Sequence, residues 1–339
     1  MIYYTTEEYM KLRFERFGRQ YAYSASNREE HESWYSRTSE RISEIIGLSR
    51  CIPAGSAPVL TDIRRYDGFT RERWLLETEP TVIMPFYLLV PDEPNGAAMI
   101  NPHGHGGGKD ACLGFSPDGG IIAPDSFGVT LVRHGYYVAA PDARGAGERR
   151  EGSHQGEGRE HENSHREMLS AGICLGITPI GGMVWDLSRL LDFLTTIPTI
   201  DPSRIGCAGM SGGGEQTIYF AALDRRISLA ITSGYFYGFR DALMLRPGNC
   251  GCNYAPHLYE TVDMGDIGAM IAPRPLFVES GTADPLNGAS GIENTISQVK
   301  IARGAYENFD AADRLVHSIH PGGHVWVGDG MLDFIKKYL

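Results

Sequence analysis

The sequence has no long apolar run and few cations relative to its acids, and each shortage excludes a class of protein. No stretch reaches the roughly 20 apolar residues that a membrane-spanning helix needs. Residues 1–10 include Glu7 and Glu8 where an export signal would be apolar. Lysine and arginine number 31 against 42 acidic residues, for a net charge of −11. Such a balance is unfavourable for nucleic acid or an anionic membrane surface. We expect a cytoplasmic protein with neither partner.

Cysteine is also sparse. The six cysteines are scattered through 339 residues, and Cys250 and Cys252 are the two that lie close together. Without an export signal, this usage is typical of reduced, mostly buried thiols rather than of a disulfide framework. Glycine, by contrast, is abundant: its 42 residues are about 12% of the chain, against a usual share of about 7%. Many glycines stand beside histidine, serine or aspartate, where backbone freedom can shape a functional site.

The pattern divides the chain into a helical N-terminal extension, residues 1–55, and a body, residues 56–339. The extension carries two helix-forming segments. We expect the second helix to open at Ser26, with Glu29 completing a capping box, and to end at Gly47. A linker with two prolines and a glycine then leads into the body.

The body predicts an α/β fold with a mostly parallel sheet. Residues 60–90 favour an antiparallel meander of extended segments joined by turns. Short apolar strands then alternate with amphipathic helices, which is typical of a parallel sheet covered on both faces. These strands are expected at residues 97–101, 136–140, 205–208, 229–233, 276–280 and 315–319, and the helices include residues 184–194 and 292–309. A charged insertion at about residues 148–180 is expected near the functional site, as a solvated loop or part of a lid.

Reactive side chains follow these strands at their carboxyl ends. In open parallel sheets, ligands bind at that edge. The pattern therefore predicts one site, to which several strands contribute. The side chains in question are His103, His105, Asp142, Arg144, Ser211, Asp284 and His324.

The sharpest motif surrounds Ser211, which stands in a Gly-x-Ser-x-Gly sequence between the strand at 205–208 and a helix at 215–223. This is the nucleophile elbow, a strained turn that exposes the serine above the sheet. Its neighbours two residues away must be small because strand and helix nearly touch, and Gly209 and Gly213 meet that need. We predict that Ser211 is the nucleophile; the alternative is an ordinary strand-to-helix turn.

A serine hydroxyl needs a base to remove its proton and a carboxylate to orient that base. His324 is the preferred base, because it lies in the loop between the last strand and the terminal helix. His320 and His317 compete, but they belong to the strand itself or its first loop residue. Asp284, in the loop after the fifth strand, is the expected carboxylate. The alternative is that it only begins a turn before the proline that follows it.

Backbone N–H groups are expected to stabilise the oxyanion of ester cleavage, by roughly 3–4 kcal/mol per donor. One donor is the N–H of Gly212, directly after the predicted nucleophile. The other comes from the glycine-rich loop at residues 103–108, where the N–H of His105 is the first choice and that of Gly106 the second. The imidazole of His103 is expected to be a structural hydrogen-bond partner.

Other interpretations of the glycine-rich segments fail on particular residues. A phosphate-binding Walker loop needs Ser or Thr after its lysine, but Asp110 follows Lys109. A dinucleotide fingerprint fails because Arg150 stands where its third glycine belongs. A metal pair of His103 and His105 lacks a further histidine or carboxylate at metal-ligand spacing nearby. We therefore predict no metal and no organic cofactor.

Three residues are candidates for substrate contact. Arg144 follows the second strand and is expected either to brace the loops around the site or to contact substrate. Tyr235 belongs to an aromatic group after the fourth strand, and Trp326 follows the predicted base. These two rings either line an acyl or sugar pocket or pack in the core.

Together these motifs resemble the α/β-hydrolase superfamily, and within it the bacterial acetyl xylan esterase-like and dienelactone hydrolase-like serine esterases. The motifs that carry the likeness lie at residues 103–108, 142–149, 209–213, 271–284 and 320–324. The resemblance covers about residues 56–339 and implies an α/β-hydrolase fold. It also implies a triad of Ser211, Asp284 and His324, in the chain order that this superfamily uses. Dienelactone hydrolases use a cysteine nucleophile, so their lactone is not the expected substrate.

The resemblance implies hydrolysis of carboxylic esters through an acyl-serine, with short acyl groups such as the acetyl groups of sugars. The partner is then a small ester or an acylated saccharide, and a homo-oligomer stays open. Two alternatives remain. An oligopeptidase-type serine peptidase usually carries a large N-terminal domain, and the extension here is short. A non-catalytic binding protein of this fold typically lacks a triad member, and this chain has a candidate for each.

Overall fold

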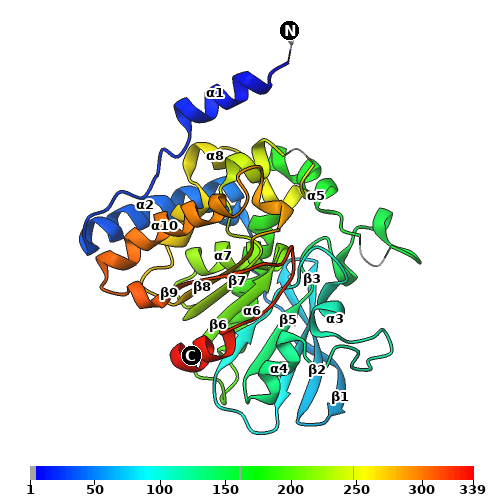
Figure 1. Cartoon of the computed structure of the whole chain (residues 1–339). Helices are drawn as coiled ribbons and strands as arrows, with labels where there is room; N and C mark the ends of the chain where they lie inside the picture. Colours follow the sequence, from blue (N-terminus) through cyan, green and yellow to red (C-terminus); the bar gives the residue numbers. More distant parts are fainter. Residues whose placement is uncertain (1–4, 160–161, 247) are drawn as a thin grey trace.

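The computed structural model describes residues 5–159, 162–246 and 248–339. Its centre is a nine-stranded sheet in the order β1-β2-β3-β5-β4-β6-β7-β8-β9 (Figure 1). The first three strands form the predicted antiparallel meander, and β3 also pairs antiparallel with β5. All pairs from β5 through β9 are parallel, which confirms the mostly parallel sheet. The strands are β1 (Val59–Tyr66), β2 (Phe69–Glu79), β3 (Val82–Pro91), β4 (Ala98–Ile100), β5 (Tyr137–Pro141), β6 (Ile205–Met210), β7 (Leu229–Ser233), β8 (Leu276–Gly281) and β9 (Leu315–His320).

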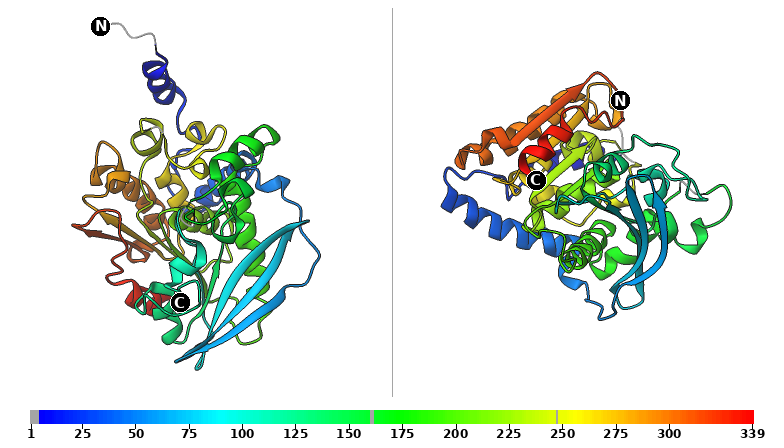
Figure 2. Two further views of the ribbon diagram at one scale, coloured as in Figure 1. Left: turned by 90° about the vertical axis from the view of Figure 1, so that its right-hand side faces the viewer. Right: turned by 90° about the horizontal axis from the view of Figure 1, so that it is seen from below.

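Helices cover both faces of the sheet, as the alternation of strands and helices predicts (Figure 2). The two largest hydrophobic clusters of the described residues lie on opposite faces of the sheet. The larger cluster is built with α2 (Arg28–Ile46), α6 (Pro179–Leu194), α7 (Gly212–Leu223), α9 (Met264–Ala269) and α10 (Ile292–Asn308). The smaller cluster is built with α3 (Gly108–Leu113), α4 (Phe127–Arg133) and α11 (Met331–Tyr338).

The two N-terminal helices differ in their packing. α1 (Glu7–Phe17) has no buried residue and stands away from the body in Figure 1. α2 instead buries one face, with Trp34, Ile42 and Ile46 inside the larger cluster. The sheet and α2 therefore share one hydrophobic core, in which burial of each large apolar side chain contributes roughly 1.5–3 kcal/mol.

The N-terminal cap of α2 lies one residue later than predicted. Asn27, not Ser26, is the capping residue, and its side chain accepts a hydrogen bond from the N–H of Glu30. The carboxylate of Glu30 accepts from the backbone N–H and the hydroxyl of Ser26, each at 2.8 Å. The capping box of Ser26 and Glu29 is therefore wrong, because the helix is capped from one position further along, where Asn27 accepts from the N–H of Glu30. The predicted end at Gly47 is confirmed, with φ of 83°.

The segment between β5 and α6 contains α5 (His165–Gly172) and short 3₁₀ turns. Residues 160 and 161 of the predicted insertion lie outside the described residues. α5 contacts the turn η6 (Gly251–Asn253), so this insertion packs against the segment after β7. α6 begins at Pro179, earlier than the predicted residue 184, because the Thr178 side chain caps it by accepting from Gly181 N–H at 3.2 Å.

All six cysteines are free thiols, as expected. The expectation that most are buried is wrong. Cys207 and Cys252 are buried, Cys174 is exposed, and the other three are half-buried.

No single helix in the described ranges is both long and apolar enough to cross a membrane. Two consecutive segments, His165–Leu175 and Pro179–Leu194, pass that test by length and composition only as a pair, and they are bent by 95°.

Candidate active site

Ser211 occupies a strained turn between β6 and α7. Its φ of 56° and ψ of −122° are unusual for a residue with a side chain, and such strain persists only where the surroundings enforce it. A Cβ atom on Gly209 would lie 2.4 Å from the Gly213 carbonyl carbon, and one on Gly213 would lie 2.2 Å from the Pro102 oxygen. The crowding explains why both positions are glycine. The turn has the conformation that the elbow motif predicts.

Asp284 and His324 form a close pair after β8 and β9. His324 Nδ1 lies 2.7 Å from Asp284 Oδ2, and the aspartate side chain is buried. The second oxygen of Asp284 accepts from the N–H of Leu286 at 2.8 Å, which fixes the carboxylate. The His324 side chain keeps 27% of its surface exposed. An imidazole held by a buried carboxylate and open on one side is suited to proton transfer.

The pair lies at the same sheet edge as Ser211. The N–H of Ser211 donates to the Ser233 carbonyl at 2.9 Å, and the next residue, Gly234, touches the pair. A Cβ atom on Gly234 would lie 2.9 Å from His324 Cε1 and 3.5 Å from Asp284 Oδ2. The fold thus brings the three residues to one place, with β7 between the serine and the histidine.

Within the described residues, no hydrogen bond joins the Ser211 hydroxyl to His324. The Ser211 hydroxyl instead lies 3.4 Å from Nδ1 of His105. Catalytic hydrogen bonds are often long or misaligned without substrate and tighten in the complex. The predicted serine–histidine contact therefore stays a prediction, whereas the histidine–aspartate contact is present.

The competing histidines are engaged elsewhere. His320 Nδ1 accepts from the N–H of Gly322 at 3.0 Å, a local loop contact. His317 Nε2 lies 3.2 Å from the Ser280 hydroxyl, and burial lowers the pKa of His317 to about 4. Both contacts fit the structural role expected of histidines in the strand or its first loop residue.

Glu279, in the middle of the predicted apolar strand at 276–280, supports the histidine loop. The side chain is buried and accepts from the Ser233 hydroxyl at 2.7 Å. It also accepts from the N–H groups of Val327 at 3.2 Å and Gly328 at 2.7 Å, just beyond His324. Sequence analysis missed this residue. The available signal was a carboxylate inside an apolar strand, which must find partners to be buried.

The loop after β4 folds over the start of α7. The imidazole of His105 covers Gly212, where an added Cβ atom would come within 2.9 Å of the ring. His103 is buried, and its Nε2 accepts from the N–H of Ala143 at 2.9 Å, as expected of a structural partner. The two predicted oxyanion residues, His105 and Gly212, are therefore neighbours.

A cavity of about 580 Å³ opens beside Ser211. Its described wall includes Trp326 and Phe127, whose rings pack 4.7 Å apart between centroids. Tyr235 is absent from this wall. Its ring is buried, and its hydroxyl donates to Asn253 Oδ1 at 2.8 Å, which is the core role.

Arg144 is held by acidic partners. Its guanidinium donates two bonds to Asp186, at 2.9 and 2.8 Å, and pairs with Glu79 at 2.6 Å. Burial opposes the charge, but these carboxylates outweigh it and raise the pKa of Arg144. This geometry favours the loop-bracing role over substrate contact.

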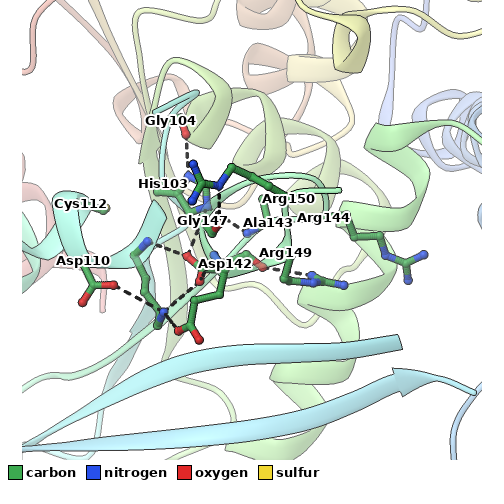
Figure 3. A network of polar contacts seen from close by, with 12 residues as sticks. His103, Gly104, Asp110, Cys112, Asp142, Ala143, Arg144, Gly147, Arg149 and Arg150 are labelled. Carbon is green, nitrogen blue, oxygen red and sulfur yellow. Dashed lines mark hydrogen bonds and ion pairs between the residues drawn. The ribbon is translucent and has the colours of Figure 1, made fainter. Parts of the chain in front are cut away.

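A buried ion pair joins the loops after β4 and β5. Figure 3 shows Asp142 between the His103 loop and the segment around Gly147. Asp142 accepts from the backbone N–H and the ammonium of Lys109, at 2.8 and 2.9 Å. Burial disfavours the charged carboxylate, yet the attraction of Lys109 outweighs it and lowers the pKa of Asp142. The ammonium of Lys109 also contacts Glu148, so the loop at 142–148 is tied to α3.

Replacing Lys109 with methionine is expected to lower the free energy of unfolding by about 3–5 kcal/mol, because it leaves Asp142 buried and unpaired. Urea denaturation of the purified variant measures the change. Lys337→Met is the matched control, since Lys337 pairs with Asp313 on the exposed surface. Equal, small losses in both variants would contradict the role given to the buried pair.

Four potential metal ligands also converge at this site, namely His105, His165, Cys250 and Cys252. In the sequence, no further histidine or carboxylate stands at metal-ligand spacing near His105. The fold supplies partners for His105 from α5 and η6. The close cysteine pair was the signal that could have pointed to them.

The sequence matches a protein family and a bacterial relative. A family model described as "Abhydrolase family" matches residues 5–292. A Bacillus subtilis (strain 168) protein named "Putative hydrolase YtaP" is 29% identical over 244 residues, which are 69% of this chain and 77% of that protein.

Solved structures share the fold at low identity. A Bacteroides fragilis NCTC 9343 protein described as a "putative acetyl xylan esterase" matches with a TM-score of 0.80 and 19% identity, over 94% of this chain and 83% of that one. A glucuronoyl esterase from Solibacter usitatus matches with a TM-score of 0.61 and 18% identity, over 90% and 93%. An acetyl xylan esterase from Paenibacillus sp. R4 matches with a TM-score of 0.58 and 17% identity, over 97% and 99%. The predicted α/β-hydrolase fold is confirmed.

Proposed function

Because this chain belongs to the Abhydrolase family, we propose that it is a serine hydrolase that cleaves carboxylic esters through an acyl-serine intermediate. One observation carries the proposal. Ser211 is held at a φ of 56° on the strand-to-helix turn, at the same sheet edge as the 2.7 Å pair of His324 and Asp284. That combination of strained serine, open imidazole and buried carboxylate is the arrangement of a nucleophile with its oriented base.

The proton path follows from the tautomer of His324. Its Nδ1 faces Asp284, so the Nδ1–H group donates a hydrogen bond to the carboxylate. Nε2 then carries no proton and is free to accept one. In the proposed reaction, Nε2 takes the proton of Ser211 as the hydroxyl attacks the ester carbonyl. It then returns the proton to the leaving alcohol. Water then attacks the acyl-serine: Nε2 takes a proton from the water and returns it to the Ser211 oxygen as the acyl group leaves. Asp284 stays ionised throughout.

We assign the stabilisation of the negative charge on the tetrahedral intermediate to N–H groups at the start of α7 and in the loop after β4. Gly212 is the first residue of this 12-residue helix, where N–H groups are free and the helix dipole favours negative charge. Gly104 lies against the nucleophile, since an added Cβ atom there would be 3.6 Å from Ser211 Cβ. We assign the second donor to the neighbouring N–H of His105 or Gly106. The chemistry uses protein groups only.

The substrate is proposed to be a short acyl ester, including acetyl groups on saccharides. The cavity beside Ser211 has a volume of about 580 Å³ and carries an aromatic wall of Trp326 and Phe127, on which a sugar ring can pack. Arg144 and Tyr235 are assigned to support rather than to substrate contact, given their occupied polar groups. The structural relatives described as acetyl xylan and glucuronoyl esterases support a carbohydrate ester.

A substrate panel tests this function. We expect the purified protein to hydrolyse p-nitrophenyl acetate and acetylated xylo-oligosaccharides, with kcat/KM falling as the acyl chain outgrows the cavity. Aminoacyl-p-nitroanilides, which report peptidase activity, should be cleaved at least about 10³-fold more slowly. Peptidase activity equal to or above esterase activity would contradict the proposal, as would inactivity on every ester of the panel.

A further inference from the structure

Four side chains with metal-binding atoms meet beside Ser211, and we propose that they bind one zinc ion. They come from three segments far apart in the chain: His105 from the loop after β4, His165 from the start of α5, and Cys250 and Cys252 from around η6. Their nearest nitrogen and sulfur atoms all lie within 4.8 Å of one another. The four side chains take no part in the steps of the proposed ester hydrolysis, in which only the backbone N–H of His105 is a candidate oxyanion donor.

The distances suit tetrahedral coordination. His105 Nε2 is 3.1 Å from Cys252 Sγ, and His165 Nδ1 is 3.0 Å from Cys250 Sγ. Zinc bonds of about 2.0–2.3 Å place neighbouring ligand atoms roughly 3.3–3.8 Å apart in a tetrahedron. The two printed pairs need to separate slightly, and small shifts of the four side chains therefore admit the ion. Two thiolates and two imidazoles are a donor set that selects zinc over magnesium or calcium, which prefer oxygen.

The other contacts of His105 and His165 orient each imidazole so that one ring nitrogen faces the cluster. His165 Nε2 lies 2.9 Å from the carbonyl oxygen of Arg144, so the Nε2–H group donates a hydrogen bond to that oxygen. That bond leaves the lone pair of Nδ1 directed at the cluster, the tautomer that a metal-binding histidine requires. His105 faces the cluster through Nε2, and its other nitrogen lies 3.4 Å from the Ser211 hydroxyl.

The charge of the surroundings also calls for a cation. Glu215, in the first turn of α7, is 1% exposed, and neither of its carboxylate oxygens has a hydrogen-bond partner among the described residues. Burial raises the pKa of Glu215 to about 7, and His105 and both cysteines are close enough to interact with its carboxyl group. Two ionised thiols beside such a buried carboxyl group are costly unless a positive charge compensates the two thiolates. A divalent ion at the four ligands supplies that charge.

The site is a structural one, because four protein ligands leave no coordination position for substrate or water. Its effect is to tie the His105 loop, α5 and η6 into one unit. Through His105 it would fix the ring that covers Gly212. This inference stands on the cluster alone, and metal content can be read whether or not the protein hydrolyses esters.

Metal analysis of the full-length protein tests the inference. Inductively coupled plasma mass spectrometry is expected to find about one zinc ion per chain. The variants Cys250→Ser with Cys252→Ser, and His165→Ala, should retain less than about a tenth of that zinc. The matched control is Cys51→Ser, which removes a half-buried free thiol outside the cluster and should keep the full amount.

A second measurement covers variants that fail to fold. Wild-type protein stripped with a chelator and reloaded with Co²⁺ should show thiolate-to-cobalt charge transfer and the intense ligand-field bands of a tetrahedral site. Wild-type protein that takes up neither zinc nor cobalt overturns the proposal, and so does a disulfide between Cys250 and Cys252 in place of metal. Zinc retained undiminished in a folded ligand variant overturns it as well.

Discussion

Replacing Ser211 with alanine lowers kcat for p-nitrophenyl acetate by about 10⁶-fold, or to the detection limit, if its hydroxyl is the nucleophile. The substitution removes the one atom that forms the acyl-enzyme bond. Alanine carries the same Cβ atom as serine, so we expect the φ of 56° at this turn and its strain to be unchanged. Circular dichroism and thermal unfolding should therefore match the wild type, which separates loss of chemistry from loss of fold.

The matched control for this variant is Ser203→Ala. Ser203 precedes β6 at the end opposite to Ser211 and is exposed. Its loss should leave kcat within about twofold of wild type, as surface substitutions away from special features change little. A Ser211→Ala enzyme that retains appreciable turnover would refute the nucleophile assignment. Equal losses in both variants would point to a fault in folding instead.

Replacing His324 with alanine is expected to cost nearly as much, about 10⁵–10⁶-fold in kcat, because the serine loses its base. His320→Ala is the discriminating comparison. His320 lies in the same loop sequence as His324, but its Nδ1 accepts from the N–H of Gly322, a local contact. Its loss should reduce kcat by no more than about tenfold. Kinetics on the same ester, at saturating substrate, measure both variants.

The double variant of Ser211 and His324 sharpens this test. Residues that act as a unit are strongly non-additive, so removing both should cost little more than removing either one. A larger loss in His320→Ala than in His324→Ala would reverse the assignment of the base. Additive losses in the double variant would show that the two residues act separately.

The elements that sequence analysis predicts well are those set by local patterns. The apolar strands and the glycines that flank Ser211 carry their own steric reasons, and the observed crowding at Gly209 and Gly213 matches them. The edge at which Asp284 and His324 meet follows from parallel strands, whose carboxyl ends share one side of the sheet. For this reason the fold and the approach of these residues could be predicted together.

The features that sequence analysis missed depend on the paths of long loops. Glu279 is a carboxylate within an apolar strand, and two of its partners come from the loop beyond His324. The cluster of His105 with the two cysteines joins segments about 145 residues apart, which no spacing rule connects. The early start of α6 is instead a local effect, because the Thr178 side chain caps the helix.

The account depends on Ser211 as the nucleophile that forms the acyl-enzyme bond. Labelling with a fluorophosphonate tests this role most directly. Treated protein is digested and its peptides are sequenced by mass spectrometry. We predict one covalent adduct, on Ser211, that is absent from Ser211→Ala and reduced when a substrate ester competes. An unmodified Ser211 in active protein, or an adduct on another residue that tracks the loss of activity, would contradict the account.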